Sequence, residues 1–247
     1  MKIASGFYKN PALGISSSNG LNLVFNQKTG VLETILLDEG YLTDVRTAVA
    51  GAVVAKYLAP DTVKSIGIIG CGIQARLQLK YLKNVLNCTK GIALGRSKDK
   101  LLSYKEEMSK DGYDIEITME SRRIAQECNL IVTTTPSKDP IIFADDLQTG
   151  VHITAVGADT IGKQELDYTI LQNANLIVVD SIKQCQTHGE IHKAFQGNLL
   201  VNQNLIEVGE IISSGGIHRK SDDITVADLT GIATQDIQIS KFILDNI

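Results

Sequence analysis

A glycine-rich turn is the clearest candidate for a binding site in this sequence. The segment Gly70–Ala75 has the spacing Gly-x-Gly-x-x-Ala and directly follows the apolar residues Ile66–Ile69. In a strand–turn–helix unit, Gly70 makes the tight turn, Gly72 lets a pyrophosphate approach the backbone, and Ala75 allows close packing of helix on strand. The N–H groups at the helix start then face the phosphates. A glycine-rich turn in another α/β protein is the alternative, which the flanking patterns disfavour.

The residues after the next apolar run bear on which dinucleotide binds. NAD-preferring sites often have an acidic residue there, about twenty residues beyond the glycines, for the ribose hydroxyls. Here the run ends at Leu94 and no carboxylate follows; Arg96 and Ser97 stand nearby. A guanidinium can stack on adenine and bind a 2′-phosphate, with help from the serine. The sequence therefore predicts NADP(H) over NAD(H), whereas Lys98 and Lys100 fit either this role or a solvated helix face.

Three charged residues are weaker candidates when considered one by one. Asp159 follows an apolar run at its carboxyl end, where ligands bind in parallel sheets, but a helix cap or a surface loop is equally compatible. Arg46 falls in the first turn of an expected helix, where the dipole disfavours a cation. An anionic partner would explain it, although a surface arginine is also compatible. Lys2 taken alone is an ordinary terminal lysine.

The first forty residues have the sequence pattern of β-strands, and a helix is expected to follow them. Thr43 can cap this helix, Asp44 lies in its first turn, and the helix is expected to end before Pro60. The preceding runs are joined by short turn-rich links, so the strands are expected to be antiparallel. The candidate strands here are Lys2–Phe7, Leu21–Asn26 and Val31–Leu36.

Strands and helices alternate through the middle of the chain. The runs are mostly apolar throughout, as in a parallel sheet covered on both faces. They predict a doubly wound α/β fold of the Rossmann type. The candidate strands are Ser65–Ile69, Gly91–Leu94, Asp114–Thr118, Leu130–Thr134, Val151–Val156 and Leu176–Asp180, with helices near 73–87, 97–111, 120–127 and 165–172.

The end of the chain is expected to return to the beginning. Asp223–Ala227 has a strand pattern, and Ala233–Asp245 has the apolar spacing of a closing helix. This helix is expected to pack beside the helix over 43–58. The resulting prediction is a Rossmann domain over 59–188, inserted in a smaller α/β domain formed by 1–58 and 189–247.

Composition excludes several classes of protein. Hydrophobic residues make up 43% and charged residues 21% of the 247 residues, and the net charge of −4 argues against nucleic-acid binding. The four cysteines form no C-x-x-C pair, and His188 and His192 have no evident third ligand, so no metal site is predicted. Without a long apolar span or a signal-peptide pattern, the sequence predicts no membrane association and a cytoplasmic location.

Several segments together resemble the ornithine cyclodeaminase/mu-crystallin family, in the right order and over nearly the whole chain. This resemblance implies a smaller dimerisation domain, hence a homodimer, a nicotinamide cofactor, and hydride transfer at a carbon–nitrogen bond of a small amino or imino acid. The segments that carry it are Tyr41–Ala48, Gly70–Ala75, Val156–Leu166, Gly189–Glu190, Asp223–Val226 and Thr230–Asp236.

The resemblance also assigns roles to individual residues. Lys2 would contact the substrate carboxylate or polarise the imine, and Arg46 would hold the carboxylate near the nicotinamide. Asp159 would bind the substrate amine and activate water. Glu190 matches a position that the family retains. The residues that would line the cofactor by the same resemblance are Thr47, Gly72, Gln74, Ala75, Thr134 and Lys163.

The chain departs from the family at its amino-terminal side. Members are usually longer there, and that stretch normally supplies further dimer-domain structure and another arginine for the substrate carboxylate. Here Met1 directly precedes Lys2, and no arginine precedes Arg46. A natural short form, a fragment, and a numbering that starts inside a longer protein are all compatible. With one cation fewer, the carboxylate would lose a charge-assisted bond of about 1.5–3 kcal/mol.

Several functions follow from these observations. The first is an NAD(P)-dependent oxidoreductase, either a cyclodeaminase that converts ornithine to proline and ammonia or a reductase of a cyclic imino acid such as Δ1-pyrroline-2-carboxylate. The missing ribose acid favours NADPH and the reductase, whereas Asp159 is typical of the deaminating branch. The alternatives are a catalytically impaired NADP(H)-binding protein of the mu-crystallin type and a structural protein without nucleotide affinity.

Overall fold

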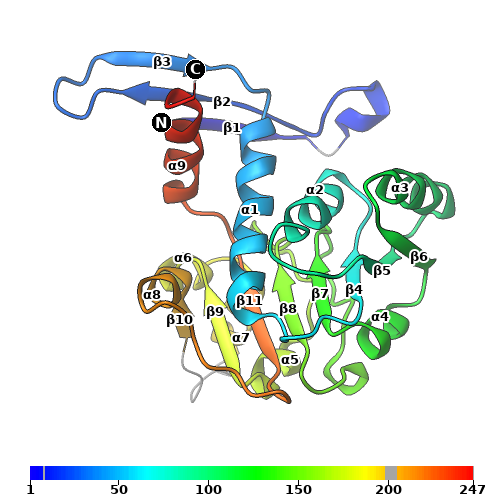
Figure 1. Cartoon of the computed structure of the whole chain (residues 1–247). Coiled ribbons are helices and arrows are strands. Elements are labelled where there is room, and N and C mark those ends of the chain that lie inside the picture. The colour runs from blue at the N-terminus through cyan, green and yellow to red at the C-terminus, as the bar shows by residue number, and fades with distance from the viewer. Residues whose placement is uncertain (8, 198–204, 247) are drawn as a thin grey trace. The chain divides into compact units, whose positions relative to one another are not determined.

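The chain forms two compact units (Figure 1). The computed structural model describes residues 1–7, 9–197 and 205–246. The smaller unit comprises Met1–Thr47 and Ile232–Ile247, and the larger unit comprises Ala48–Gly231. Helix α1 (Tyr41–Leu58) contributes its first turns to the smaller unit and the remainder to the larger one. The α/β class and the parallel sheet predicted from the sequence are confirmed.

The larger unit is built on an eight-stranded parallel sheet with the order β10-β9-β11-β8-β7-β4-β5-β6. From β4 the chain adds β5 and β6 on one side, and it then returns to add β7 and β8 on the other side. The strand order therefore reverses between β4 and β7, which lie side by side near the centre of the sheet. Such a switch point leaves a crevice at the carboxyl ends of the strands. The strands are β4 (Ile66–Ile69), β5 (Lys90–Leu94), β6 (Asp114–Thr118), β7 (Leu130–Thr133), β8 (His152–Ala155), β9 (Leu176–Val179), β10 (Leu205–Glu207) and β11 (Thr225–Asp228).

Helices cover both faces of this sheet because its strands are apolar on both sides. Ile68 packs into the core under α2, while the next residue, Ile69, packs into the core on the opposite face, as side chains alternate along a strand. One core contains residues of α1, α2, α3 and α8; the other contains residues of α4, α5, α6 and α7. The helices are α2 (Ile73–Leu82), α3 (Lys98–Lys110), α4 (Ser121–Glu127), α5 (Tyr168–Asn173), α6 (Ile182–Cys185), α7 (Glu190–Gln196) and α8 (Val208–Ser213), with a 3-10 turn, η2 (Ala144–Asp146).

The strand near the end of the chain lies elsewhere than expected. β11 is inserted between β9 and β8, and its residues Val226 and Ala227 are fully buried, one on each face. The unit boundaries therefore fall at 47/48 and 231/232 rather than at 58/59 and 188/189. The predicted range 189–247 also includes 198–204 and 247, which lie outside the described residues. A strand that places an apolar side chain on each face, as Val226 and Ala227 do, gains most by entering a sheet covered on both faces.

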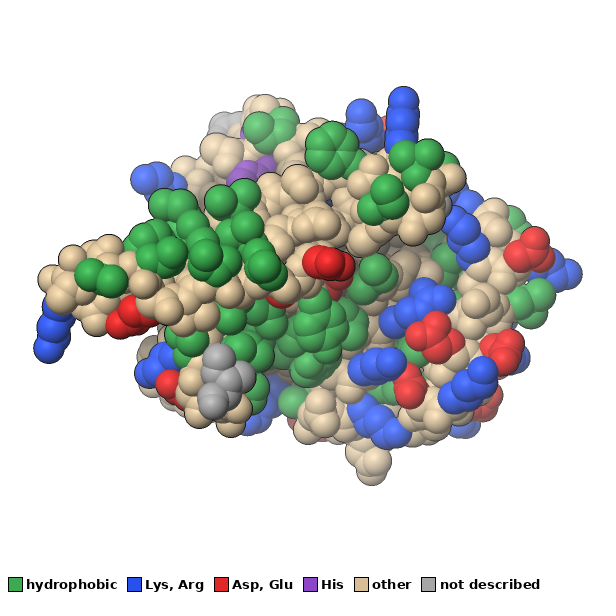
Figure 2. Space-filling view, turned by 90° about the horizontal axis from the view of Figure 1, so that it is seen from above, with side chains coloured by type: hydrophobic (Ala, Val, Ile, Leu, Met, Phe, Trp, Pro, Cys, Tyr) green, Lys and Arg blue, Asp and Glu red, His purple; other side chains and the backbone are tan. Residues whose placement is uncertain are grey.

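The smaller unit contains a three-stranded antiparallel sheet and helix α9 (Ala233–Leu244). The strands are β1 (Lys2–Gly6), β2 (Ser18–Phe25) and β3 (Leu32–Leu36), and a 3-10 turn, η1 (Asn10–Leu13), follows β1. α9 packs on β2, and it meets the first turns of α1 through Arg46. Hydrophobic side chains remain exposed in this unit, and such side chains gather on the face seen in Figure 2; those of the smaller unit include Ile3, Phe7, Leu13, Val31, Ile35, Leu37, Ile237 and Phe242.

The start of α1 differs from the prediction by two residues. The helix begins at Tyr41, and the carboxylate of Asp38 accepts a hydrogen bond of 2.8 Å from the Leu42 N–H. Thr43, the predicted cap, therefore lies inside the helix, where its carbonyl accepts from the Thr47 hydroxyl at 2.8 Å. Aspartate is as good a capping residue as threonine, and Gly40, with φ of 91°, allows the chain to turn into the helix here.

Candidate dinucleotide and substrate sites

The glycine-rich turn has the geometry that the sequence predicts. β4 ends at Ile69, and Gly70 follows with φ of 112°, a conformation that only glycine adopts without strain. A Cβ on Gly70 would lie 2.5 Å from the Thr134 hydroxyl oxygen, so the turn also depends on glycine for its packing. The Gly70 N–H donates to the Leu94 carbonyl at 2.9 Å. This bond ties the turn to the end of β5.

The start of α2 opens into a pocket. Gly72 is the N-cap, and no described side chain caps the helix or lies within 4 Å of where a Cβ on Gly72 would stand. The first N–H groups of a helix need partners, and the dipole there favours an anion. The pocket has a volume of about 950 Å³, within the range of ligand sites. Both features suit a pyrophosphate.

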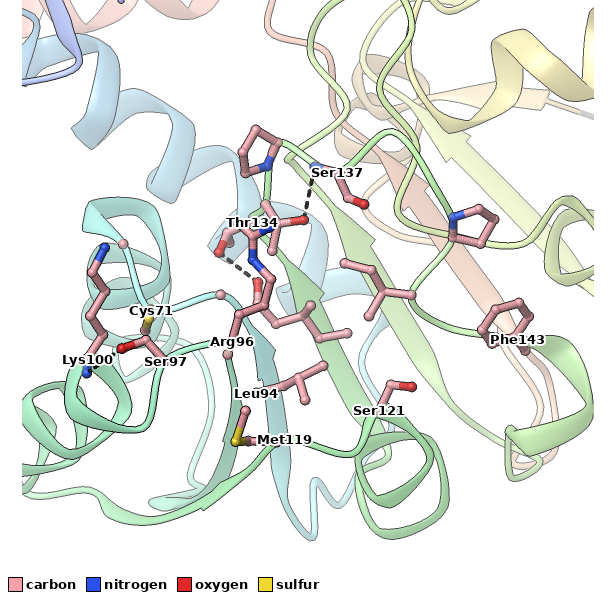
Figure 3. A pocket seen from close by; sticks show the side chains of 18 residues that line it. Cys71, Leu94, Arg96, Ser97, Lys100, Met119, Ser121, Thr134, Ser137 and Phe143 are labelled. Carbon is pink, nitrogen blue, oxygen red and sulfur yellow. Dashed lines mark hydrogen bonds between the residues drawn. The ribbon is translucent and has the colours of Figure 1, made fainter. Parts of the chain in front are cut away.

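Five of the residues predicted to bind the cofactor line this pocket (Figure 3). Gly70 and Gly72 belong to its lining, Thr134 follows β7, and Arg96 and Ser97 follow β5. The Ser97 hydroxyl caps α3, accepting from the Lys100 N–H at 3.5 Å. Further lining residues are Ile69, Cys71, Leu94, Gly95, Lys100, Met119, Ser121, Thr135, Pro136, Ser137, Pro140, Ile141 and Phe143. The described lining thus carries Arg96 and Lys100 but no carboxylate, which favours a polyanionic ligand.

Other predicted cofactor residues are not among those that line this pocket. Ala75 is fully buried between α2 and the sheet, and its carbonyl accepts from the Tyr104 hydroxyl at 3.0 Å. Gln74 lies in the first turn of α2 but is not part of the described lining. Thr47 belongs to the smaller unit. Lys163 lies in the loop after β8, where it pairs with Asp159.

The pair Asp159–Lys163 joins two predicted functional residues. The Lys163 ammonium lies 2.5 Å from Asp159 Oδ1. The Asp159 side chain is 50% exposed, whereas that of Lys163 is only 10% exposed. Asp159 therefore presents a carboxylate to solvent on a loop at the carboxyl end of β8. The mostly buried ammonium group of Lys163 pairs with this carboxylate. This is the edge of the sheet at which ligands bind in such folds.

Three further carboxylates of the larger unit are completely enclosed. Glu165 accepts from the N–H groups of Thr135 at 2.6 Å and Gly157 at 3.0 Å. Burial raises the pKa of Glu165 to about 7, against the lowering effect of these hydrogen bonds, and raises that of Asp228 to about 7. Burial together with Asp228 and Glu165 also raises the pKa of Glu190. Glu165 was not predicted from the sequence, although an acid two residues beyond Lys163, next to the apolar Leu166, was a detectable signal.

The predicted cations of the smaller unit share one carboxylate that the sequence analysis missed. Asp236 Oδ1 lies 3.0 Å from Lys2 Nζ and 3.1 Å from Arg46 Nε, and Arg46 also donates to the Gln235 side chain at 2.8 Å. All three charged side chains are less than one-fifth exposed. Burial and the Arg46 charge lower the pKa of Lys2, although Asp236 acts in the opposite direction. The three groups carry a net positive charge, which a substrate carboxylate could neutralise.

The sequence pattern of the ornithine cyclodeaminase/mu-crystallin family matches residues 1–247. The chain belongs to this family. An uncharacterised cyclodeaminase of Sinorhizobium fredii is 38% identical over 243 residues, which span 97% of this chain and 73% of the relative. The alanine dehydrogenase of Archaeoglobus fulgidus is 36% identical over 242 residues, 96% of this chain and 73% of the relative. A Δ1-pyrroline-2-carboxylate reductase of Bacillus cereus is 31% identical over 253 residues, 99% and 76% respectively.

Solved structures of family members have the same fold. An archaeal alanine dehydrogenase dimer with bound NAD superposes with a TM-score of 0.91 at 32% identity, covering 99% of this chain and 76% of that one. The Thermococcus litoralis Δ1-pyrroline-2-carboxylate reductase, in complex with NADH and L-proline, gives 0.89 at 26% identity, covering 97% and 75%. The predicted family and fold class are confirmed. The predicted nicotinamide dinucleotide and the oxidoreductase class agree with what these relatives bind and do.

The described residues of this family member contain neither a metal-ligand cluster nor a membrane-spanning helix. Among them, no three His, Cys, Asp or Glu side chains are placed to hold a metal ion. His188 Nδ1 is hydrogen-bonded to the Thr187 hydroxyl and His192 Nδ1 to the Gln186 carbonyl. Each of these two histidines thus has a hydrogen-bond partner close to it in the sequence. None of the described helices is long and apolar enough to cross a bilayer.

Proposed function

We propose that this chain is an NAD(P)-dependent oxidoreductase that acts on the carbon–nitrogen bond of a small amino or imino acid. Reduction of a cyclic imino acid such as Δ1-pyrroline-2-carboxylate is the reaction that the site supports best. The observation that carries the proposal is the uncapped start of α2 at Gly72, open to a pocket of about 950 Å³. Relatives of this chain named for such reductions support the substrate class.

The dinucleotide is assigned to the residues that line this pocket. The N–H groups after Gly72 are free of a capping side chain among the described residues, which suits the pyrophosphate. Arg96 and Ser97, at the end of β5, are assigned to a 2′-phosphate, so NADP(H) is proposed as the preferred form. When bound, a nicotinamide dinucleotide supplies or accepts hydride. The protein's part is to orient the substrate and to handle protons.

The substrate carboxylate is assigned to Lys2 and Arg46. Asp236 neutralises only one of these two cations and holds both within 3.1 Å of one oxygen. The remaining positive charge is mostly buried, so an anion bound there would gain more than it would at an exposed site. A guanidinium also fixes the plane of a carboxylate, which limits the orientations of the carbon that reacts.

Asp159 is assigned to the substrate nitrogen. Its carboxylate is half exposed and anchored by Lys163, so it can hold a protonated amine or iminium and exchange a proton with water. In a deaminating reaction the same group would activate the attacking nucleophile. Asp159 is therefore the observation that favours the second candidate, conversion of ornithine to proline and ammonia. A solved lysine cyclodeaminase, 28% identical with a TM-score of 0.86, shares this fold.

The smaller unit is proposed to form the homodimer interface and to hold the substrate carboxylate, while the larger unit is proposed to hold the nucleotide and to supply Asp159. Exposed apolar side chains on the sheet of the smaller unit, such as Ile3 (53% exposed) and Ile35 (52% exposed), support an interface. The archaeal alanine dehydrogenase is described as a dimer. A cytoplasmic location stays a prediction from the sequence.

A fluorescence titration and two assays test the proposal. NADPH and NADH are titrated into the protein, and reduction of Δ1-pyrroline-2-carboxylate and release of ammonia from ornithine are then measured. We expect tighter NADPH binding and turnover of the imino acid. Tight NADH with weak NADPH would remove the role given to Arg96. Nucleotide binding without turnover of either compound would favour the impaired mu-crystallin-type alternative.

A further inference from the structure

Two loops at the carboxyl edge of the sheet carry part of the pocket wall and the proposed acid of the larger unit. The loop after β7 contains Thr134 and the pocket wall from Thr135 to Ser137. The loop after β8 leads through Gly157 to Asp159. The paired strands end just before these loops, and the Val156 N–H still donates to the Thr133 carbonyl at 3.1 Å. Beyond that point, some other contact must hold the loops together.

Glu165 supplies that contact with one carboxylate. Its Oε1 accepts from the Thr135 N–H at 2.6 Å, and its Oε2 accepts from the Gly157 N–H at 3.0 Å. The side chain is fully buried. A Cβ on Gly157 would lie 2.2 Å from both Glu165 Oε2 and the Thr135 carbonyl oxygen, so glycine is needed for the loops to approach this closely. Each oxygen of the carboxylate thus holds a different loop.

The backbone of Glu165 is itself held in place. Its carbonyl accepts from the N–H groups of Ile141 at 2.7 Å and Ile142 at 3.2 Å. Its own N–H and that of Leu166 donate to the two oxygens of Glu190 at 2.8 and 3.0 Å. Glu190 begins α7, whose Ile191 N–H donates to Asp228 at the end of β11. The carboxylate that joins the loops is therefore anchored, through α7, to β11 of the sheet.

This arrangement costs stability rather than adding to it. A buried carboxylate loses its hydration, and burial raises the pKa of Glu165 to about 7 despite its hydrogen bonds, so the charged form is held at a cost. What two N–H bonds to one rigid group do provide is a fixed distance between two loops. A group that costs stability but fixes geometry next to proposed reacting groups is expected to serve the reaction.

We propose that Glu165 is a positioning residue, which locks the loop bearing Asp159 to the pocket wall at Thr135 and so sets where that acid stands relative to the dinucleotide. The inference rests on the proposed function for its catalytic consequence, but the lock itself is testable without turnover. Glu165 touches neither pocket nor solvent, so it acts only through the two loops.

The main variant is Glu165→Gln, compared with Glu106→Gln, which changes an exposed side chain on α3. A glutamine has one acceptor oxygen, and its NH₂ group would face the other N–H as a second donor. One loop is therefore released. We expect exchange of the Thr135 or Gly157 amide hydrogen to accelerate by about tenfold or more, the change for one lost hydrogen bond. Glu106→Gln is expected to leave both amides unchanged.

Steady-state kinetics separate positioning from general damage. In Glu165→Gln we expect kcat for the imino acid to fall about 10- to 100-fold, because small misplacements of a reacting group have effects of this size. The KM for the imino acid should change by less than about threefold, since its carboxylate is assigned to Lys2 and Arg46. Equal losses in kcat and in the fraction of folded protein, measured by circular dichroism, would overturn the proposal.

A second variant and the unaltered protein keep the test decisive. Gly157→Ala forces the lock apart while Glu165 stays in place, and the same fall in kcat is expected. If Glu165→Gln does not fold, Gly157→Ala and the exchange rates of the unaltered protein decide. Rapid exchange of Thr135 and Gly157 in the unaltered protein, or full kcat in Gly157→Ala, would overturn the lock. If the unaltered protein reduces no imino acid, the proposed function fails, yet the amide exchange still tests the lock.

Discussion

The two units of this chain handle charge and apolar surface in different ways. In the larger unit, core side chains such as Ile66 and Val178 are fully buried, and the enclosed carboxylates are bonded to backbone N–H groups. In the smaller unit, Leu37 is 76% exposed, and the buried charges of Lys2 and Arg46 depend on the single carboxylate of Asp236. The proposed nucleotide pocket is thus lined by residues of one unit, whereas the cations proposed to bind the substrate belong to the other. Variants of the two units should therefore have separable effects.

The largest effect is expected at Asp159, where a residue of the larger unit acts on the substrate rather than on the nucleotide. Asp159→Asn should lower kcat by about 10²- to 10⁴-fold, the range for loss of a general acid–base group. NADPH affinity should be unchanged in a fluorescence titration. Asp114→Asn, an exposed acid in β6, is the matched control. Undiminished turnover in Asp159→Asn would end the role proposed for this acid.

A variant of Arg46, in the smaller unit, tests whether substrate binding can be changed without changing nucleotide binding. Arg46→Ala should lower kcat/KM for the imino acid by about 10- to 150-fold, because one charge-assisted hydrogen bond to the carboxylate is lost. The dissociation constant of NADPH should stay the same. Arg122→Ala removes an arginine that is 71% exposed, on α4, and serves as the control. A loss of nucleotide affinity as large as the loss in kcat/KM would break the comparison between the units.

The buried His152 of the larger unit should make the free energy of unfolding depend on pH. Its ring is bonded to the hydroxyls of Thr225 and Thr154, and burial, then the Arg219 charge, lowers its pKa to about 3. The unfolded chain takes up a proton below its ordinary value of 6.5, but the folded protein does not, so the free energy of unfolding falls as pH drops below 6.5. This loss amounts to about 2 kcal/mol at pH 5.

Urea unfolding followed by circular dichroism isolates this effect from others. Glu165 and Asp228 have raised folded-state pKa values of about 7, so they bind protons in the folded state first and add stability as pH falls through the same window. The informative quantity is therefore the difference in the free energy of unfolding between the variant and the unaltered protein at each pH. Relative to the unaltered protein, His152→Asn should gain about 2 kcal/mol between pH 6.5 and 5. The exposed His218→Asn is the control, and parallel curves for His152→Asn and the unaltered protein would contradict the prediction.

The smallest effect is expected at Arg96, which tests the choice of cofactor. Arg96→Ala should weaken NADPH binding by about tenfold, as for loss of one charge-assisted bond at an exposed site. NADH binding should be unchanged. Lys98→Ala, in the first turn of α3 and outside the described pocket lining, is the control. Equal losses for both nucleotides would assign Arg96 to the adenine rather than to a phosphate.

Local patterns predicted the larger unit well and its last strand poorly. The run Ile66–Ile69, the turn at Gly70 and the start of α2 are adjacent in sequence, and each has its own conformational preference. β11 was recognised as a strand, but its place between β9 and β8 depends on residues far away in the sequence. A strand pattern states that a segment is extended and buried, but it does not name its neighbours.

The candidate site shows the same division. Arg96 and Ser97 could be predicted as pocket residues because they closely follow an apolar strand next to the glycine turn. Asp236 was missed as the partner of Lys2 and Arg46, since an acid in the first turn of a helix has a sufficient local explanation in the helix dipole. Glu165 was missed because its neighbours along the chain do not show what its side chain contacts. One carboxylate oxygen accepts from the loop after β7 and the other from the loop after β8.

The sequence by itself determined the doubly wound sheet, the dinucleotide turn and the family, because these rest on short-range spacing and on residues that fold with their neighbours. Only the tertiary structure decided which charges meet. Lys2 finds its carboxylate 234 positions away at Asp236, and Glu165 joins loops that precede it by 30 and 8 residues. Charge pairing depends on distance in space, and a linear pattern does not contain that distance until the chain has folded.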